Sequence, residues 1–144
     1  MSYTPATERT IYFIGTTTGQ SSIMKVFPRW AEALKLNAVI KGIDFVPDEG
    51  APRYREAVRF IKGDPLSLGA LVTTHKVNLL KASHDLFDEL DPYAETLGEI
   101  SRLCHVAVWR TRSVGASGSV RPLRLRSATC SSPQREARGA FGLK

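Results

Sequence analysis

Short apolar runs and helical apolar stripes alternate along the first hundred residues. Residues 10–15, TIYFIG, form a β-branched and aromatic run that ends at a glycine, which predicts a buried strand. The polar segment 16–22 follows and predicts a loop. Apolar residues then recur at helical spacing over 23–34, and Ser21 or Ser22 provides a suitable N-cap for that helix.

The helix over 23–34 has a predicted inner face and one irregularity. Phe27 and Trp30 lie on the apolar stripe with Leu34, so we expect both aromatic rings in the core. Pro28 falls inside the same pattern, where it either kinks the helix or marks its true first turn.

The alternation continues with a second and a third unit. Residues 38–46 predict a strand with Gly42 as a bulge, and a helix is expected from Pro52. Residues 70–72 predict a third strand after the turn-forming segment GDPLSLG. Asp91, followed by proline, has the pattern of an N-cap for a later helix.

This order predicts an α/β fold with a small, mostly parallel sheet flanked by helices. Ligands in such sheets bind beyond the carboxyl ends of the strands. The loops after Gly15 and after Val72 both lie at such ends, and Lys76 follows the second of them. The start of the next helix, which Thr73 or Thr74 can cap, favours an anionic ligand there.

The charge of the chain is concentrated in its last third. Residues 1–101 carry 11 Lys and Arg against 13 Asp and Glu, whereas residues 102–144 carry nine against one. This last segment is rich in Arg, Ser, Gly, Ala and Pro and shows no sustained periodicity, so we predict a disordered basic tail. Its charge would allow salt-sensitive contact with nucleic acid, although we do not expect nucleic acid to define the function.

Several classes of protein are disfavoured by the sequence. No apolar run approaches the length of a membrane span, and the N-terminus has no signal-peptide pattern, so we expect a cytoplasmic protein without membrane contact. Cys104 and Cys130 stand in unrelated contexts and predict no disulfide framework. Cys104 and His105 have no further ligand at a familiar spacing, and we predict no metal site.

Three segments together resemble the N-terminal, substrate-binding domain of shikimate dehydrogenases, including the related quinate/shikimate enzymes. Residues 69–101, GALVTTHKVNLLKASHDLFDELDPYAETLGEIS, are similar to the family's Asn-Val-Thr-x-Pro-His-Lys segment and the stretch after it. Residues 13–34 are similar to its first loop and helix. The resemblance covers roughly 11–101, and it implies a substrate-binding domain over 10–101 with the basic tail over 102–144.

The resemblance implies roles for individual residues. Lys76 matches the family lysine that lies beside the substrate hydroxyl, where a partly desolvated amine can assist transfer of the hydroxyl proton. The implied substrate-binding residues are Ser21, Ser22, Thr73, Thr74 and Ser101. The implied ligand is a small carboxylic acid such as shikimate or quinate. NADP is the cofactor of the complete family enzyme, and we expect no cofactor to be bound by this chain itself.

The sequence also departs from the family pattern. Thr74 stands where the motif has proline, the second loop serine falls on Ile23, and the family asparagine falls on Ser101. A related acid is therefore an alternative to shikimate. No aspartate follows Asp91 to pair with the lysine, and 43 residues after Ser101 are too few for a nucleotide-binding domain, which a separate chain could supply.

We therefore expect the substrate-binding half of an NADP-dependent oxidoreductase that acts on shikimate or a related hydroxy acid. We interpret the chain as truncated or frameshifted near residue 102, and as inactive alone. Two alternatives remain: a non-catalytic module that binds a small acid, and a nucleic-acid-associated protein with a basic tail.

Overall fold

A computed structural model describes residues 3–105 and 125–127. The strands are β1 (Thr10–Gly15), β2 (Val39–Asp44), β3 (Ser67–Val72), β4 (Arg102–His105) and β5 (Leu125–Ser127). The helices are α1 (Ser22–Ala33), α2 (Ala51–Gly63), α3 (Lys76–Ser83) and α4 (Pro92–Leu97), with 3-10 turns η1 (Thr18–Gln20) and η2 (His84–Leu86).

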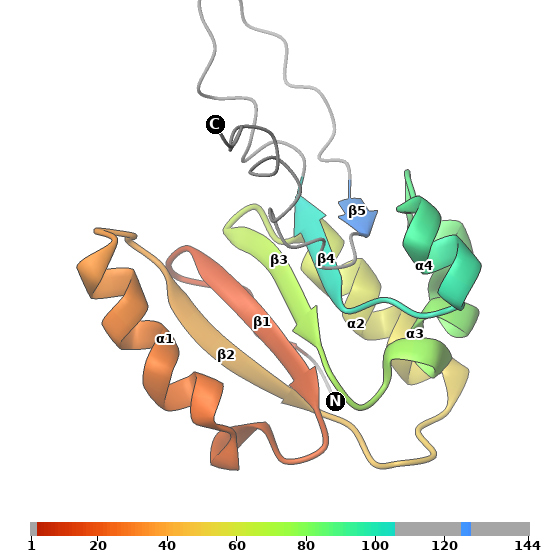
Figure 1. Cartoon of the computed structure of the whole chain (residues 1–144), viewed down its shortest axis with the longest axis horizontal. Helices are drawn as coiled ribbons and strands as arrows, with labels where there is room; N and C mark the ends of the chain where they lie inside the picture. The colour runs from red at the N-terminus through yellow and green to blue at the C-terminus, as the bar shows by residue number, and fades with distance from the viewer. Residues whose placement is uncertain (1–2, 106–124, 128–144) are drawn as a thin grey trace, which may run out of the picture.

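The strands form one sheet in the order β2-β1-β3-β4-β5. β1 pairs in parallel with both β2 and β3, whereas β4 runs antiparallel to β3 and β5 antiparallel to β4. In Figure 1, α1 lies along β2, and α2, α3 and α4 gather toward the other edge of the sheet. The predicted α/β fold with a mostly parallel sheet between helices is therefore confirmed.

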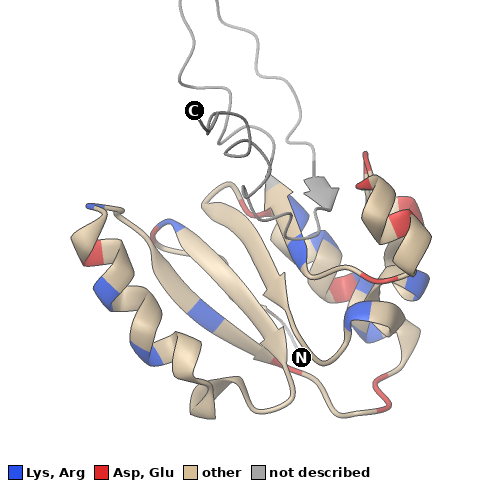
Figure 2. Cartoon of the chain, viewed as in Figure 1, with Lys and Arg blue, Asp and Glu red and all other residues tan. Residues whose placement is uncertain are grey.

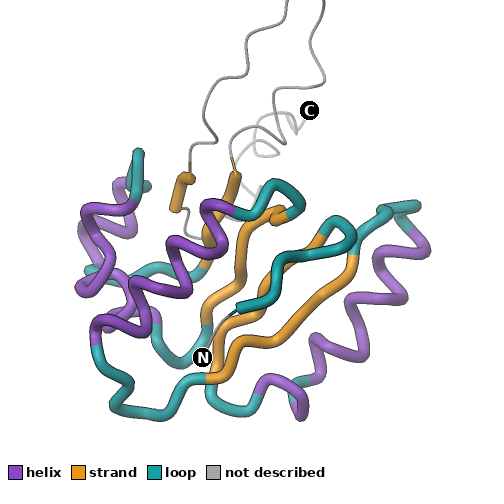
Figure 3. The backbone as a smooth tube through the Cα atoms, turned by 180° about the vertical axis from the view of Figure 1, so that it is seen from behind, coloured by secondary structure: helices purple, strands orange, loops and turns teal. Residues whose placement is uncertain are grey.

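The main core fills the face of the sheet that α2 and α3 cover. Figure 3, which views the molecule from behind Figure 1, shows the purple helices that cover this face against the orange strands. Alternate residues of the strands point into it, as expected for a period of two. Its buried side chains include Tyr12 and Ile14 of β1, Val72 of β3, and Tyr54 and Ile61 of α2.

Two positions require glycine because a neighbouring group lies so close to the backbone that a side chain would not fit. A Cβ at Gly42 would lie 2.0 Å from the Thr18 hydroxyl oxygen. The pairing of β1 with β2 runs without interruption past Gly42, so the predicted bulge there is wrong. The irregularity lies instead beside Gly69, which has φ +117° and approaches the Leu103 carbonyl oxygen so closely that a Cβ would lie 2.0 Å from it.

The outer side of α1 differs from the prediction. Phe27 is buried, as expected, but Trp30 is 55% exposed and Leu34 is 69% exposed. The prediction of Trp30 as a core aromatic is therefore wrong. The physical reason is that α1 lies along the edge strand β2, so only a narrow side of the helix, marked by Phe27 and Ala31, reaches the sheet.

The sheet continues beyond the predicted domain of residues 10–101. β4 (Arg102–His105) pairs with β3, and β5 (Leu125–Ser127) pairs with β4. The rest of the predicted basic tail lies outside the described residues, so its character and the proposed frameshift stay predictions. Within the described part of the chain, no helix combines the length and the apolar character that crossing a membrane requires.

Candidate functional site

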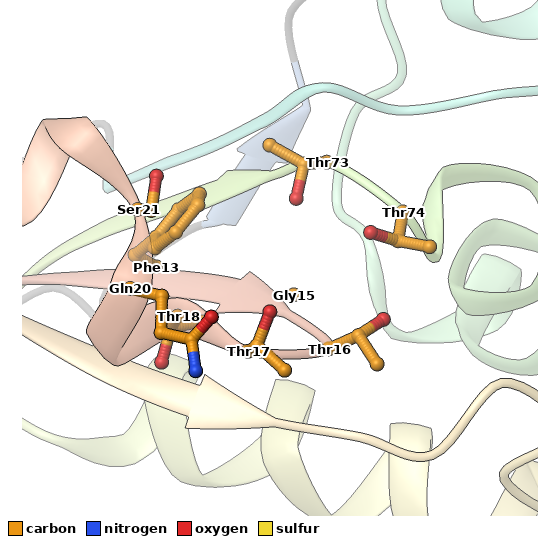
Figure 4. Close-up of a pocket in the computed structure, with 9 residues that line it drawn as sticks. All are labelled: Phe13, Gly15, Thr16, Thr17, Thr18, Gln20, Ser21, Thr73 and Thr74. Carbon is orange, nitrogen blue, oxygen red and sulfur yellow. The ribbon is translucent and has the colours of Figure 1, made fainter.

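A pocket of about 410 Å³ opens at the carboxyl ends of β1 and β3. Because β2 and β3 lie on opposite sides of β1, the connections that leave β1 and β3 diverge there. In open α/β sheets, a crevice at this point is the usual place for a ligand. Nine residues line the pocket (Figure 4): Phe13, Gly15, Thr16, Thr17, Thr18, Gln20, Ser21, Thr73 and Thr74.

The lining of the pocket is polar but uncharged. It offers six hydroxyl groups and the carboxamide of Gln20, with the ring of Phe13 as its large apolar surface. In Figure 2 the loop from β1 to α1 is tan throughout, and the loop after β3 is tan up to the start of α3. Hydroxyls and amides both donate and accept hydrogen bonds, so the pocket suits a small ligand with several oxygen atoms.

The first loop is held in place by β2. The backbone N–H of Thr18 donates to Asp44 Oδ1 at 2.7 Å, and Thr18 packs over the bare backbone of Gly42. On the other side, Gly15 leaves space for two threonines, because a Cβ there would lie 3.2 Å from both the Thr18 and the Thr73 side chains. Small residues in β1 and β2 thus set the shape of the pocket.

The two predicted serines have different positions. Ser21 lines the pocket and occupies the N-cap position of α1, but its hydroxyl makes no capping hydrogen bond. The sequence allows Ser21 either to cap α1 or to contact a ligand. Its hydroxyl does not cap the helix, which leaves it able to contact a ligand. Ser22 is exposed as the first residue of α1 and does not line the pocket.

The two predicted threonines both line the pocket from the loop after β3. Thr73 continues the ladder with β1, because its N–H and its hydroxyl both donate to the Ile14 carbonyl oxygen, at 3.1 and 3.2 Å. Thr74 is exposed and caps no helix, since α3 begins only after His75. The loop thus presents two hydroxyl-bearing side chains opposite Ser21 (Figure 4).

Lys76 and Ser101 lie outside the pocket lining. Lys76 is the first residue of α3, and its Nζ lies 3.4 Å from Glu99 Oε1, with both side chains about one-third exposed. Ser101 stands just before β4, and its carbonyl oxygen accepts a hydrogen bond from the Val72 N–H at 2.9 Å. The proposed roles of these residues in binding and catalysis stay predictions.

A buried histidine lies beneath the pocket. His75 is 2% exposed, and its Nε2 lies 3.4 Å from Thr16 Oγ1, which belongs to the lining. Its Nδ1 lies 2.8 Å from the hydroxyl oxygen of Tyr54 in α2. Burial raises the pKa of Tyr54, and the side chain of Asn78 acts in the opposite direction.

From the sequence alone, His75 is expected to be a packing or capping residue and is only a minor candidate for a base, and neither Thr16 nor Tyr54 is a candidate site residue. The only signal was the position of each one: Thr16 directly after β1, Tyr54 on the inner stripe of α2, and His75 before α3. The three meet because the ends of β1 and β3 are adjacent in the sheet.

The comparisons with known proteins bear on this architecture. No family model matches the chain, and no curated protein matches it. Among solved structures, it is similar to shikimate dehydrogenase 1 from Peptoclostridium difficile, with a TM-score of 0.56, 16% identity, and coverage of 84% of this chain and 37% of the other. The described chain has a shikimate dehydrogenase-like fold.

Two further structures extend the comparison. Shikimate 5-dehydrogenase from Listeria monocytogenes, solved with shikimate and NAD, gives a TM-score of 0.56 at 19% identity, covering 73% of this chain and 34% of that one. The 5-ketofructose reductase of Gluconobacter sp. strain CHM43 gives 0.58 at 16% identity, covering 83% and 35%. The chain thus spans about a third of the length of these dehydrogenases and fits a partial N-terminal domain.

Proposed function

We propose that the chain is the substrate-binding domain of an oxidoreductase that acts on a small hydroxylated acid of the shikimate or quinate type. The observation that carries the proposal is the position of the pocket. It lies at the carboxyl ends of β1 and β3, in a fold shared with dehydrogenases whose solved complexes contain shikimate. Ser21, Thr73 and Thr74, which the resemblance assigns to substrate binding, all line it.

The residues of the pocket have distinct proposed tasks. Ser21, Thr73 and Thr74 would hold the oxygen atoms of the ligand through their hydroxyls. Lys76 would take the proton of the substrate hydroxyl as the alcohol is oxidised, or return it in the reverse reaction. In the structure its amine is engaged by Glu99 at 3.4 Å, so the proposal requires Lys76 to turn from Glu99 toward Thr74 when substrate binds.

The cofactor NADP would bind to a separate nucleotide-binding domain. Within the described residues, no strand-to-helix loop has the Gly-x-Gly-x-x-Gly pattern that approaches a pyrophosphate. The loop after β1 contains only Gly15 and Gly19, with three threonines between them. A pocket of about 410 Å³ also suits a small molecule better than a dinucleotide. Oxidation by this chain therefore depends on a second domain.

The first experiment is calorimetric titration of the chain with shikimate and with quinate. Binding of either acid supports the proposal, and no binding of either at millimolar ligand contradicts it. Lys76→Met should weaken binding because it removes the amine that the proposal brings to the substrate hydroxyl. The matched control is Lys62→Met, because Lys62 is also partly buried and ion-paired, with Asp88 at 3.1 Å, but it stands in the last turn of α2 and does not line the pocket.

A non-catalytic module for small acids is the second candidate, and the engagement of the Lys76 amine by Glu99 favours it. An assay of NADP reduction with shikimate and quinate, run with an added nucleotide-binding domain, separates the two candidates. The third candidate, contact with nucleic acid, rests on residues 102–144. Deleting residues 106–144, which keeps β4 paired with β3, should abolish any such affinity and leave acid binding unchanged.

A further inference from the structure

Three polar side chains from separate elements form a connected line beneath the pocket. Thr16 comes from the loop after β1, His75 from the loop before α3, and Tyr54 from α2. We infer that His75 is a positioning residue that fixes the Thr16 hydroxyl as a hydrogen-bond donor into the pocket. The identity of the ligand rests on the proposed function, whereas the arrangement of protons on His75 does not.

The line is well shielded from water at its inner end. Tyr54 is 1% exposed and His75 is 2% exposed, and the ring of Phe45 packs edge-on against both. The Tyr54 oxygen lies 2.8 Å from His75 Nδ1, and Thr16 Oγ1 lies 3.4 Å from Nε2. Buried polar atoms that are left without partners destabilise a protein, so each proton along this line has a preferred place.

The Tyr54 hydroxyl determines the direction of the line. In the described part of the chain, its hydrogen-bond partner is His75 Nδ1, at 2.8 Å. If Nδ1 carried a proton, the Tyr54 O–H would have no acceptor in a buried position, at a cost of about 1–3 kcal/mol. The Tyr54 hydroxyl therefore donates to Nδ1, and the imidazole proton sits on Nε2.

The consequence reaches the pocket. The Nε2–H of His75 then donates to Thr16 Oγ1 and occupies one of the two acceptor lone pairs of that hydroxyl. This orients the Thr16 proton toward the pocket, where it can donate to a carboxylate, carbonyl or hydroxyl oxygen of a ligand. The preference for an acceptor above Thr16 would make Thr16 a specificity determinant of the pocket.

The proton on His75 can be observed directly. In protein labelled with ¹⁵N-histidine, long-range nitrogen–proton spectra distinguish the two neutral tautomers from the doubly protonated ring. His75→Gln identifies the signal among the three histidines. We expect the Nε2–H form in the free protein at neutral pH, and a change of form in Tyr54→Phe. An Nδ1–H or doubly protonated ring in the parent chain overturns the inference.

Tyr12→Phe is the control for this spectrum. Tyr12 is also a buried tyrosine, but its hydroxyl donates to Asp64 Oδ2 at 2.9 Å, away from the pocket. Its removal should leave the His75 signal unchanged. A change of the same size in Tyr12→Phe and Tyr54→Phe would mean that the tautomer merely follows the loss of core packing, and would overturn the assignment.

Ligand titration tests the outer end of the line. Thr16→Val keeps the shape of the side chain but removes the donor, and should weaken shikimate or quinate binding about tenfold. Thr16→Ser should restore most of the affinity, and addition of the acid should shift the Nε2–H signal of the parent chain. Unchanged affinity in Thr16→Val overturns the role of Thr16. If neither acid binds while the Nε2–H form is found, the proposed function fails and the role of His75 stands.

Discussion

Replacement of Gly42 by alanine should disturb the pocket from outside it. Gly42 lies in the edge strand β2 and does not line the pocket. A Cβ at this position would lie 2.0 Å from Thr18 Oγ1 and 2.8 Å from Thr18 Cβ. Real side chains do not approach so closely, and the Thr18 side chain is 4% exposed, so it has little room to move away. The turn η1, which carries Thr18, must therefore shift.

The size of the effect follows from overpacking. Forcing extra atoms into a packed site costs about 1–3 kcal/mol. The general gain of replacing a strand glycine by alanine, about 0.5–1 kcal/mol, offsets only part of this. We expect Gly42→Ala to lower the free energy of unfolding by about 1–2 kcal/mol in urea denaturation. Because Thr18 lines the pocket, acid binding should weaken as well.

A double-mutant cycle identifies the cause. Thr18→Gly removes the atoms that clash, so Gly42→Ala in that background should be neutral or slightly stabilising. Gly63→Ala is the matched control, because an added Cβ at the end of α2 meets nothing within 4 Å. If Gly42→Ala unfolds at the same urea concentration as the parent chain, the packing of Thr18 on β2 is not as described.

Three further predictions concern other parts of the described chain. Gly69→Ala should lower the free energy of unfolding by about 3 kcal/mol or more, measured by urea denaturation, because it combines φ +117° with a contact of 2.0 Å to the Leu103 carbonyl oxygen. Ser21→Ala should leave the melting temperature unchanged, because its hydroxyl caps no helix, yet should weaken acid binding about tenfold in calorimetry; a large loss of stability would contradict this. The hydrogen bonds from Arg55 lower the pKa of Asp85 from 3.8 to about 2, so their stabilising contribution is present above pH 3.8 and is lost as the pH falls toward 2. Urea denaturation at a series of pH values between 2 and 3.8 measures this loss as a fall in the free energy of unfolding. The fall should be absent in Asp85→Asn.

The strands illustrate what local sequence determines. TIYFIG predicts a strand over 10–15, and β1 has these bounds, because a β-branched run that ends at glycine is buried on both sides of a central strand. β3 begins at Ser67, three residues earlier than predicted. The segment GDPLSLG contains turn-forming residues, but the chain passes through Gly69 with a positive φ and keeps its pairing with β4.

The helices show where local sequence is insufficient. Asp91 caps α4 as predicted, and its side chain accepts a hydrogen bond from the Tyr93 N–H at 2.8 Å, because capping depends on residues that are neighbours in sequence. Trp30 has the helical spacing of a core residue but is 55% exposed. Periodicity predicts which side of a helix is apolar, whereas the width of the sheet beneath the helix decides how much of that side is covered.

The site divides in the same way. Ser21, Thr73 and Thr74 could be predicted, because they follow or precede regular elements at the carboxyl ends of strands, where α/β proteins bind ligands. The link between Thr16 and His75 could not, because it joins residues 59 apart and depends on which strands are adjacent.

The same distinction predicts which changes will affect the function of this domain most selectively. A lining hydroxyl such as that of Thr74 is exposed and contributes little to stability, so its loss should alter binding alone. Tyr54 is buried in the core and also ends the line of hydrogen bonds to the pocket, so its loss should alter both properties. If the proton on His75 sets the ligand preference, conservative changes of Tyr54 will alter specificity without touching the pocket, and that result is not expected of a histidine that only fills space.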